Sequence, residues 1–106
     1  MKKPIPESML LHATNRTQWR AWLKTHYRSQ AEIWLVYHKK HTGQPRISYN
    51  DAVEEALCFG WIDSIVRTLD ENTFAQRFSV RRPGSKYSQA NVERLRALAK
   101  QGKIVK

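Results

Sequence analysis

Residues 61–80, WIDSIVRTLDENTFAQRFSV, contain two runs of strand-forming residues that flank a polar turn. In residues 74–80 aromatic and apolar side chains alternate with smaller or polar ones, which is the two-residue period of a half-buried strand. Residues 61–69 are rich in β-branched types, and Asp70-Glu71-Asn72 has the composition of a turn. The stretch therefore predicts an antiparallel hairpin.

Two elements are predicted just before this hairpin. Residues 33–37, IWLVY, show no polar alternation, which suits a central strand that is covered on both faces. Ser48 is a candidate N-cap for the helix that follows, because Asp51 stands at the third helical position. Gly60 is expected to end that helix.

Amphipathic helices are expected near both ends of the chain. Trp19, Trp22 and Leu23 share one face of a helix predicted over residues 15–28. Ser88 is expected to open a last helix, which Gly102 would end.

All 106 residues together fit one small domain. The predicted order is α-β-α-β-β-α, an α+β fold with a small, mainly antiparallel sheet and about three packed helices. A chain of this length supports one hydrophobic core, which excludes a two-domain enzyme. We expect the domain to span residues 15–102, with an N-terminal arm over 1–14 and a C-terminal tail over 103–106, as a monomer or weak dimer.

The net charge of +10 is unevenly distributed. Residues 1–46 carry nine basic and two acidic side chains, residues 47–80 carry two basic and six acidic, and residues 81–106 carry eight basic and one acidic. Basic ends around an acidic middle predict either a polarised surface or charge pairing between segments.

The sequence predicts a cytoplasmic protein without membrane insertion. The basic start Met1-Lys2-Lys3 is followed by Pro4 and not by an apolar signal region, and the longest apolar run is far too short to span a membrane. Cys58 is a single cysteine, expected to be a buried structural thiol in a reducing compartment. The histidines lack metal-site spacing, apart from His38-x-x-His41 beside Cys58, and phosphate-loop motifs are absent, so we expect no metal and no cofactor.

Several motifs fit one family pattern. The longest is residues 56–64, ALCFGWIDS. Shorter ones are Trp19-Arg20-x-Trp22-Leu23, Trp34-Leu35-Val36, Lys39-Lys40, Thr42-Gly43, Arg77-Phe78, Arg81-Arg82-Pro83 with Ser85, Tyr87-Ser88 and Asn91. Over residues 15–102 the chain thereby resembles the YdeI/OmpD-associated (bacteriocin-protection) family.

The resemblance implies a bacterial role in tolerance of cationic antimicrobial peptides or envelope stress, and association with an outer-membrane porin. It transfers no catalytic residue. The chain departs from the family pattern at Tyr87, where members usually have Trp, and at Val80, where they usually have Pro. Longer members continue into a second, helical segment, so the chain up to Lys106 is expected to correspond to their N-terminal portion.

The segment from 81 to 91, RRPGSKYSQAN, is a candidate anion site. Guanidinium groups bind phosphate and carboxylate in bidentate fashion, and the start of the last helix supplies N–H groups and a positive dipole end. An alternative interpretation is purely structural: Ser88 caps the helix, Asn91 assists it, and the arginines pair with Asp63, Glu54 or Glu55.

Asp63 and Trp61 lie in the first strand of the predicted hairpin. A half-buried carboxylate needs a partner, so Asp63 is expected either to form an ion pair with Arg81 or Arg82 or to act as a general base or ligand-orienting group. Trp61 would wall the pocket or fill the core. The predicted ligand-binding set is Trp61, Asp63, Arg81, Arg82, Ser85, Tyr87, Ser88 and Asn91.

These observations predict a non-enzymatic module that binds a small anionic ligand or an acidic protein surface. The alternative is a small basic nucleic-acid-binding protein that uses its basic end segments, and an enzyme using Asp63 with the arginines is a third interpretation. A concave pocket that unites the predicted residues would favour the first or the third interpretation, and a flat basic face the second.

Overall fold

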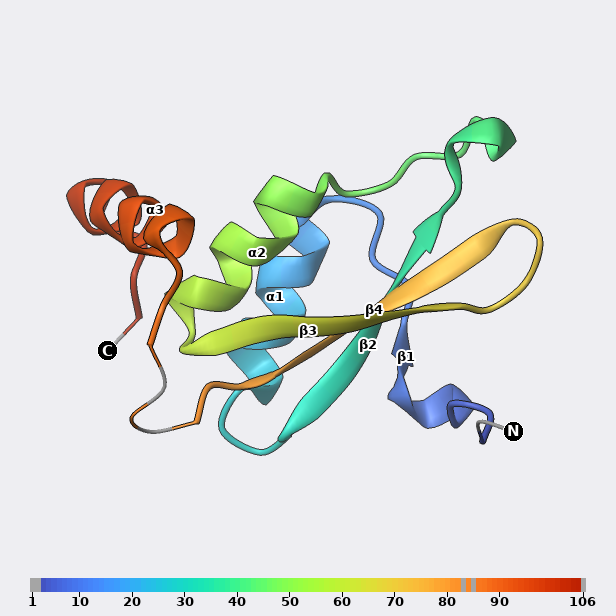
Figure 1. Ribbon diagram of the computed structural model, residues 1–106, viewed down its shortest axis with the longest axis horizontal. Coiled ribbons are helices and arrows are strands. Elements are labelled where there is room, and N and C mark those ends of the chain that lie inside the picture. Colours follow the sequence, from blue (N-terminus) through green and yellow to red (C-terminus); the bar gives the residue numbers. More distant parts are fainter. Residues whose placement is uncertain (1–2, 83, 85, 106) are drawn as a thin grey trace.

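A computed structural model describes residues 3–82, 84 and 86–105. The fold is α+β, with three α-helices and a four-stranded mixed sheet of strand order β1-β2-β4-β3 (Figure 1). The elements are β1 (Leu10–Leu11), α1 (Arg16–His26), β2 (Glu32–His38), α2 (Tyr49–Cys58), β3 (Trp61–Thr68), β4 (Thr73–Val80) and α3 (Gln89–Lys100), with 3-10 turns η1 (Glu7–Met9) and η2 (Lys40–Thr42). The six longer elements follow the predicted order.

The predicted hairpin is present as β3 and β4, which pair in antiparallel fashion. Asp70 holds the turn, because its Oδ1 accepts hydrogen bonds from the backbone N–H groups of Asn72 and Thr73, both at 2.8 Å. The register shifts between Asp63 and Val66, which marks a β-bulge in β3.

Strand β2 is central, as its apolar run predicts. It pairs with β4 in antiparallel fashion and with β1 in parallel fashion, so the sheet is mixed and two of its three pairings are antiparallel. On one face Leu35 joins the main core. On the other, Trp34 and Val36 pack with Ala75 and are covered by Leu10 and other residues of the N-terminal segment. The expected arm over residues 1–14 thus contributes a strand to the sheet, which two residues are too few to predict from periodicity.

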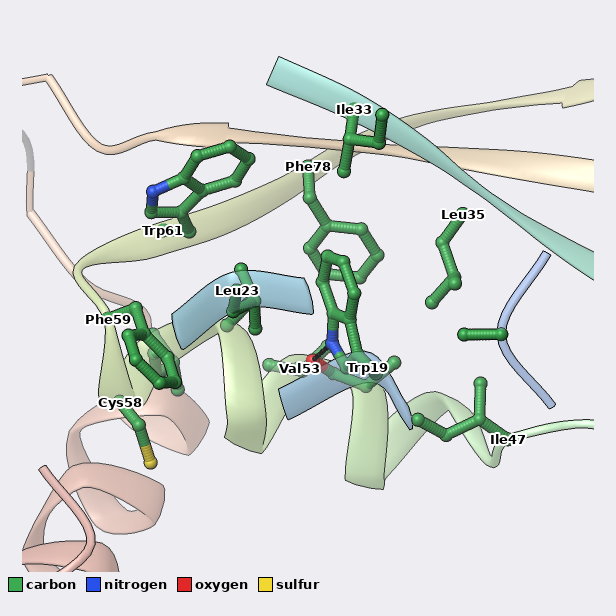
Figure 2. Packing of buried hydrophobic residues seen from close by; sticks show 14 of the residues in the cluster. Trp19, Leu23, Ile33, Leu35, Ile47, Val53, Cys58, Phe59, Trp61 and Phe78 are labelled. Atoms are coloured by element: carbon green, nitrogen blue, oxygen red, sulfur yellow. Dashed lines mark hydrogen bonds between the residues drawn. The ribbon is translucent and has the colours of Figure 1, made fainter. Parts of the chain in front are cut away.

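Helices α1 and α2 cover the Leu35 face of the sheet and enclose the main core. Phe78 of the sheet contacts the ring of Trp19, with ring centroids 5.1 Å apart, and the Trp19 indole N–H donates to the carbonyl oxygen of Ala52 at 2.9 Å (Figure 2). Burial raises the pKa of the Cys58 thiol, which disfavours the reactive thiolate. The C-terminal segment docks here too, because the N–H of Val105 donates to the Cys58 carbonyl oxygen at 2.8 Å.

Both predicted N-caps are present. The Ser48 hydroxyl accepts from the N–H of Asp51 at 3.1 Å, and the Ser88 hydroxyl accepts from the N–H of Asn91 at 3.2 Å. Gly60 has φ +76°, a left-handed conformation that lets the chain leave α2 and enter β3 directly. Among the described residues, no helix is both long and apolar enough to cross a membrane.

Candidate anion-binding site

A pocket of about 330 Å³ lies where β3 meets the N-terminal ends of α2 and α3. Its lining includes five of the eight predicted ligand-binding residues, namely Asp63, Arg81, Tyr87, Ser88 and Asn91. The hairpin explains this convergence. The N–H of Arg81 donates to the carbonyl oxygen of Gly60 at 3.1 Å, so the chain leaving β4 lies beside the start of β3 before it enters α3.

The start of α3 forms one wall of the pocket. Ser88 caps the helix, and Asn91 is buried with its side-chain oxygen accepting from Arg94 Nη1 at 2.9 Å. Arg94 also donates from Nε to the Asn50 side chain at 3.0 Å, which ties α3 to the first turn of α2. The first-turn N–H groups of α3 and the positive end of its dipole are therefore held at the pocket.

Cationic and aromatic side chains form the second wall. The Arg81 guanidinium carbon lies 4.0 Å from the centroid of the Tyr87 ring, a cation–π contact that orients the arginine. Lys86 is exposed and also lines the pocket.

Asp63 also lines the pocket and is held by a chain of neutral hydrogen-bonding groups. Its Oδ2 accepts from the Tyr49 hydroxyl at 3.0 Å and from Gln76 Nε2 at 3.3 Å, and Gln76 Oε1 accepts from the Tyr37 hydroxyl at 2.9 Å. Burial and the hydrogen bond to Asp63 raise the pKa of Tyr49, so its hydroxyl keeps its proton. The predicted ion pair between Asp63 and Arg81 or Arg82 stays a prediction.

Trp61 and Arg82 lie away from this pocket. Trp61 is 1% exposed and lies in the main core (Figure 2). It packs edge-on against Trp22, so it fills the core, the second of its two expected roles. Arg82 lines an adjoining groove of about 600 Å³ with Arg77, which shares Ile62 and Lys86 with the anion pocket but does not include Arg81. Successive residues of an extended chain point to opposite sides, which separates Arg82 from Arg81. Ser85 lies outside the described residues.

Sequence reasoning missed Tyr49 and Lys86. Lys86 stands inside the segment that was singled out, but an isolated lysine carries no spacing signal. Tyr49 is the first residue of α2, next to the predicted cap Ser48, and nothing in its local sequence places it opposite β3.

A second basic surface follows α1. Arg16, Arg20, Lys24 and Arg28 recur every four residues and so share one side of the helix. Arg16 pairs with Asp51, Glu54 and Glu55, and Arg20 pairs with Glu55. The acidic middle of the chain is thus paired with the basic start, one of the two predicted outcomes.

Lys24 and Arg28, the exposed members of this row, border two adjoining pockets of about 490 and 390 Å³ between α1 and the C-terminal segment. Arg20 and Lys24 line both pockets, Arg28 extends the first and Lys103 the second. Within the part of the chain that the structure describes, no salt bridge involves Lys24, Arg28 or Lys103. We name these three residues the α1 basic row. The described residues contain no cluster of three or more potential metal ligands.

One family model matches residues 11–106, and it is described as a domain of unknown function (DUF8412). The match includes the pocket and the α1 basic row. No curated protein and no solved structure matches the chain.

Proposed function

The chain belongs to the DUF8412 family, and we propose that it is a non-enzymatic module whose pocket at the start of α3 binds a small anionic ligand or an anionic group on an acidic protein surface. The observation that carries this proposal is the convergence on one pocket of Arg81, Lys86 and the capped N-terminus of α3. Two side-chain cations and oriented N–H groups stabilise a bound anion together.

Asp63 narrows the chemistry of the ligand. Its carboxylate would repel an anion placed directly against it, so the anionic group belongs at the Arg81, Lys86 and Ser88 side of the pocket. The carboxylate also has acceptor capacity beyond the two hydrogen bonds at Oδ2. A ligand with a hydroxyl or ammonium group beside its anionic group satisfies both sides of the pocket.

Adjacent arginines provide a matched test of this proposal. Arg81 lines the pocket and Arg82 lines the other groove, so replacing either by Ala removes the same charge from neighbouring positions. Titration calorimetry with inorganic phosphate at low salt should show that Arg81→Ala weakens binding at least tenfold, the loss of a charge-assisted contact. Arg82→Ala should stay within about twofold of the unmodified protein, since only general charge is lost. Equal losses in both variants, or no phosphate binding to the unmodified protein, would contradict the proposal.

We extend the proposal to the cellular role that the YdeI/OmpD resemblance implies, a cytoplasmic contribution to tolerance of cationic antimicrobial peptides or envelope stress. The supporting observation is that the longest matching motif, residues 56–64, runs from α2 into β3 and reaches the pocket at Asp63. Expression in a peptide-sensitive bacterial strain should raise survival, and Arg81→Ala should abolish the gain at equal protein level. Unchanged protection by Arg81→Ala would separate the cellular role from the pocket.

Nucleic-acid binding is the second candidate, and the α1 basic row favours it. Lys24 lies near the end of α1, Arg28 follows the helix, and Lys103 comes from the C-terminal segment, so three cations gather beside the two pockets where phosphates could bind. Tyr27 and Phe59 line the first of these pockets, and aromatic rings beside cations are typical of surfaces that bind single strands.

A further inference from the structure

Next to the anion pocket along β3 lies a smaller pocket of about 200 Å³, which we name the second pocket. Its lining comes from β2, β3, β4 and the segment that leads into α2. Its walls are largely apolar: Tyr37 and Ile47 are buried, and the rings of Tyr37 and Phe74 stack with their centroids 5.0 Å apart. Val66 stands at its edge.

The neutral polar groups of this second pocket, those of Tyr37, Tyr49 and Gln76, are engaged in hydrogen bonds within the protein. Gln76 is buried at the base, and its amide donates to Asp63 and accepts from Tyr37. Arg46 stands at the rim, with its guanidinium 5.8 Å from the centroid of the Phe74 ring. The remaining walls therefore offer an occupant apolar and aromatic contact more than hydrogen bonds.

Tyr49 belongs to both pockets. It is 53% exposed, lines each of them, and donates its hydroxyl proton to Asp63 in the anion pocket. Asp63 and Val66, which border the two pockets, stand opposite Phe78 and Gln76, so the β-bulge leaves them only two ladder positions apart, a separation of roughly 7 Å. A single elongated ligand that crosses Tyr49 can therefore reach both.

We infer that the ligand of the anion pocket is amphiphilic: its anionic group lies at Arg81, Lys86 and the start of α3, and an aromatic or aliphatic group on the other side of Tyr49 fills the pocket formed by Tyr37, Ile47, Val66 and Phe74. This inference rests on the proposed function, because the anionic group is what places the ligand. It specifies the ligand class as a small organic acid or phosphate ester with an apolar tail.

A series of phosphate esters tests this inference directly. Inorganic phosphate, phenyl phosphate, 2-phenylethyl phosphate and 3-phenylpropyl phosphate present the same anionic group and move the ring progressively farther from it. Calorimetry should show affinity increasing along the series, with 3-phenylpropyl phosphate at least tenfold tighter than inorganic phosphate, because the ring loses its water-exposed surface. The uncharged 3-phenylpropanol should bind at least tenfold more weakly than its phosphate ester.

Val66 and Ile65 supply the matched variants. They are 55% and 56% exposed and adjacent in β3, but only Val66 lines the second pocket. Val66→Trp should remove the gain of 3-phenylpropyl phosphate over inorganic phosphate while leaving phosphate affinity within twofold, and Ile65→Trp should preserve both affinities. As a measurement on the unmodified protein, only the longer esters should shift the amide NMR signals of Val66 and Phe74.

The outcomes separate this inference from the proposed function. Phosphate binding that depends on Arg81, with no gain for the longer esters, would overturn the amphiphilic ligand and leave the anion site standing. A gain that survives Val66→Trp equally with Ile65→Trp would also overturn it, since the ring would then bind elsewhere. Failure of every phosphate compound to bind would overturn both.

Discussion

Glu55 carries a negative charge in the interior and is 1% exposed. Arg20 Nη1 donates to its Oε1 at 2.9 Å, and Arg16 Nε donates to its Oε2 at 2.8 Å. Burial raises the pKa of Glu55, but the hydrogen bonds from Arg20 and Arg16 lower it more, so the pKa lies below its ordinary value of 4.5. The carboxylate therefore joins α1 to α2 as an ion.

Replacing this carboxylate should reveal its contribution to stability. At pH 7, Glu55→Gln should lower the free energy of unfolding by about 2–3 kcal/mol, because it leaves two partly buried arginines without their central anion. Urea denaturation followed by tryptophan fluorescence measures the change. Glu54→Gln is the matched control on the same helix: Glu54 makes a more exposed bond to Arg16, and its loss should cost under about 1 kcal/mol.

The contribution of Glu55 to the free energy of unfolding should depend on pH. Because the folded-state pKa of Glu55 is lowered, its stabilisation is complete above pH 4.5 and is lost as the pH falls below that value through the folded-state pKa. The stability difference between the unmodified protein and Glu55→Gln should therefore shrink between pH 5 and pH 3. A difference that stays constant over this range would show that Glu55 acts through packing and not through its charge.

At the scale of single elements, α2 and α3 begin in the same way. Ser48 and Ser88 each accept a hydrogen bond from the N–H three residues later, at 3.1 and 3.2 Å. Only Ser88 lines the anion pocket. The two caps are therefore a natural pair in which a common structural role can be separated from binding.

Ser48→Ala and Ser88→Ala should each lower the free energy of unfolding by about 1 kcal/mol, the usual contribution of an N-cap. Phosphate affinity should fall at least threefold in Ser88→Ala, because the hydroxyl is lost from the pocket and the first turn is less firmly held. Ser48→Ala should keep its phosphate affinity. Thermal denaturation and phosphate titration of both variants provide the measurements, and equal affinities in the two variants would remove Ser88 from the binding site.

For the molecule as a whole, the net charge of +10 is divided between paired and exposed cations. Arg16 and Arg20 are neutralised by α2, and Arg77 pairs with Glu32 at 2.8 Å. In the α1 basic row, Lys24 and Arg28 are exposed and Lys103 of the C-terminal segment is half-buried beside them. A polyanion would consequently meet a localised strip, not a uniformly basic surface.

Binding of single-stranded DNA tests whether the cations form a localised strip or a uniformly basic surface. If Lys24, Arg28 and Lys103 contact phosphates, the logarithm of the affinity for single-stranded DNA should fall with the logarithm of salt concentration with a slope of about −2, since each contact releases about 0.7 counterions. Lys24→Glu with Arg28→Glu should abolish binding measured by fluorescence anisotropy. Lys40→Glu with Arg96→Glu, an equal charge change at exposed positions elsewhere, should retain it. Equal losses in both double variants would contradict a localised strip.

Local signals in the sequence were sufficient for most of the secondary structure. The alternation in β4, the unbroken apolar run of β2 and the serine caps of α2 and α3 depend on residues within a few positions of one another, so periodicity and capping chemistry reveal them. Strand β1 was missed because Leu10–Leu11 is too short for a period and its parallel pairing joins distant segments.

Some features of the candidate site likewise follow from local sequence, and others depend on the tertiary structure. The sequence alone determined that an arginine pair, a helix cap and a strand carboxylate occur close enough to meet, since a hairpin and a short loop link them. Only the tertiary structure decided that Arg81 and Arg82 serve different grooves, that Trp61 belongs to the core, and that Tyr49 faces Asp63. The physical reason is that these choices depend on which side of the sheet each residue occupies and on how α2 packs against it, and neither is encoded within one local segment.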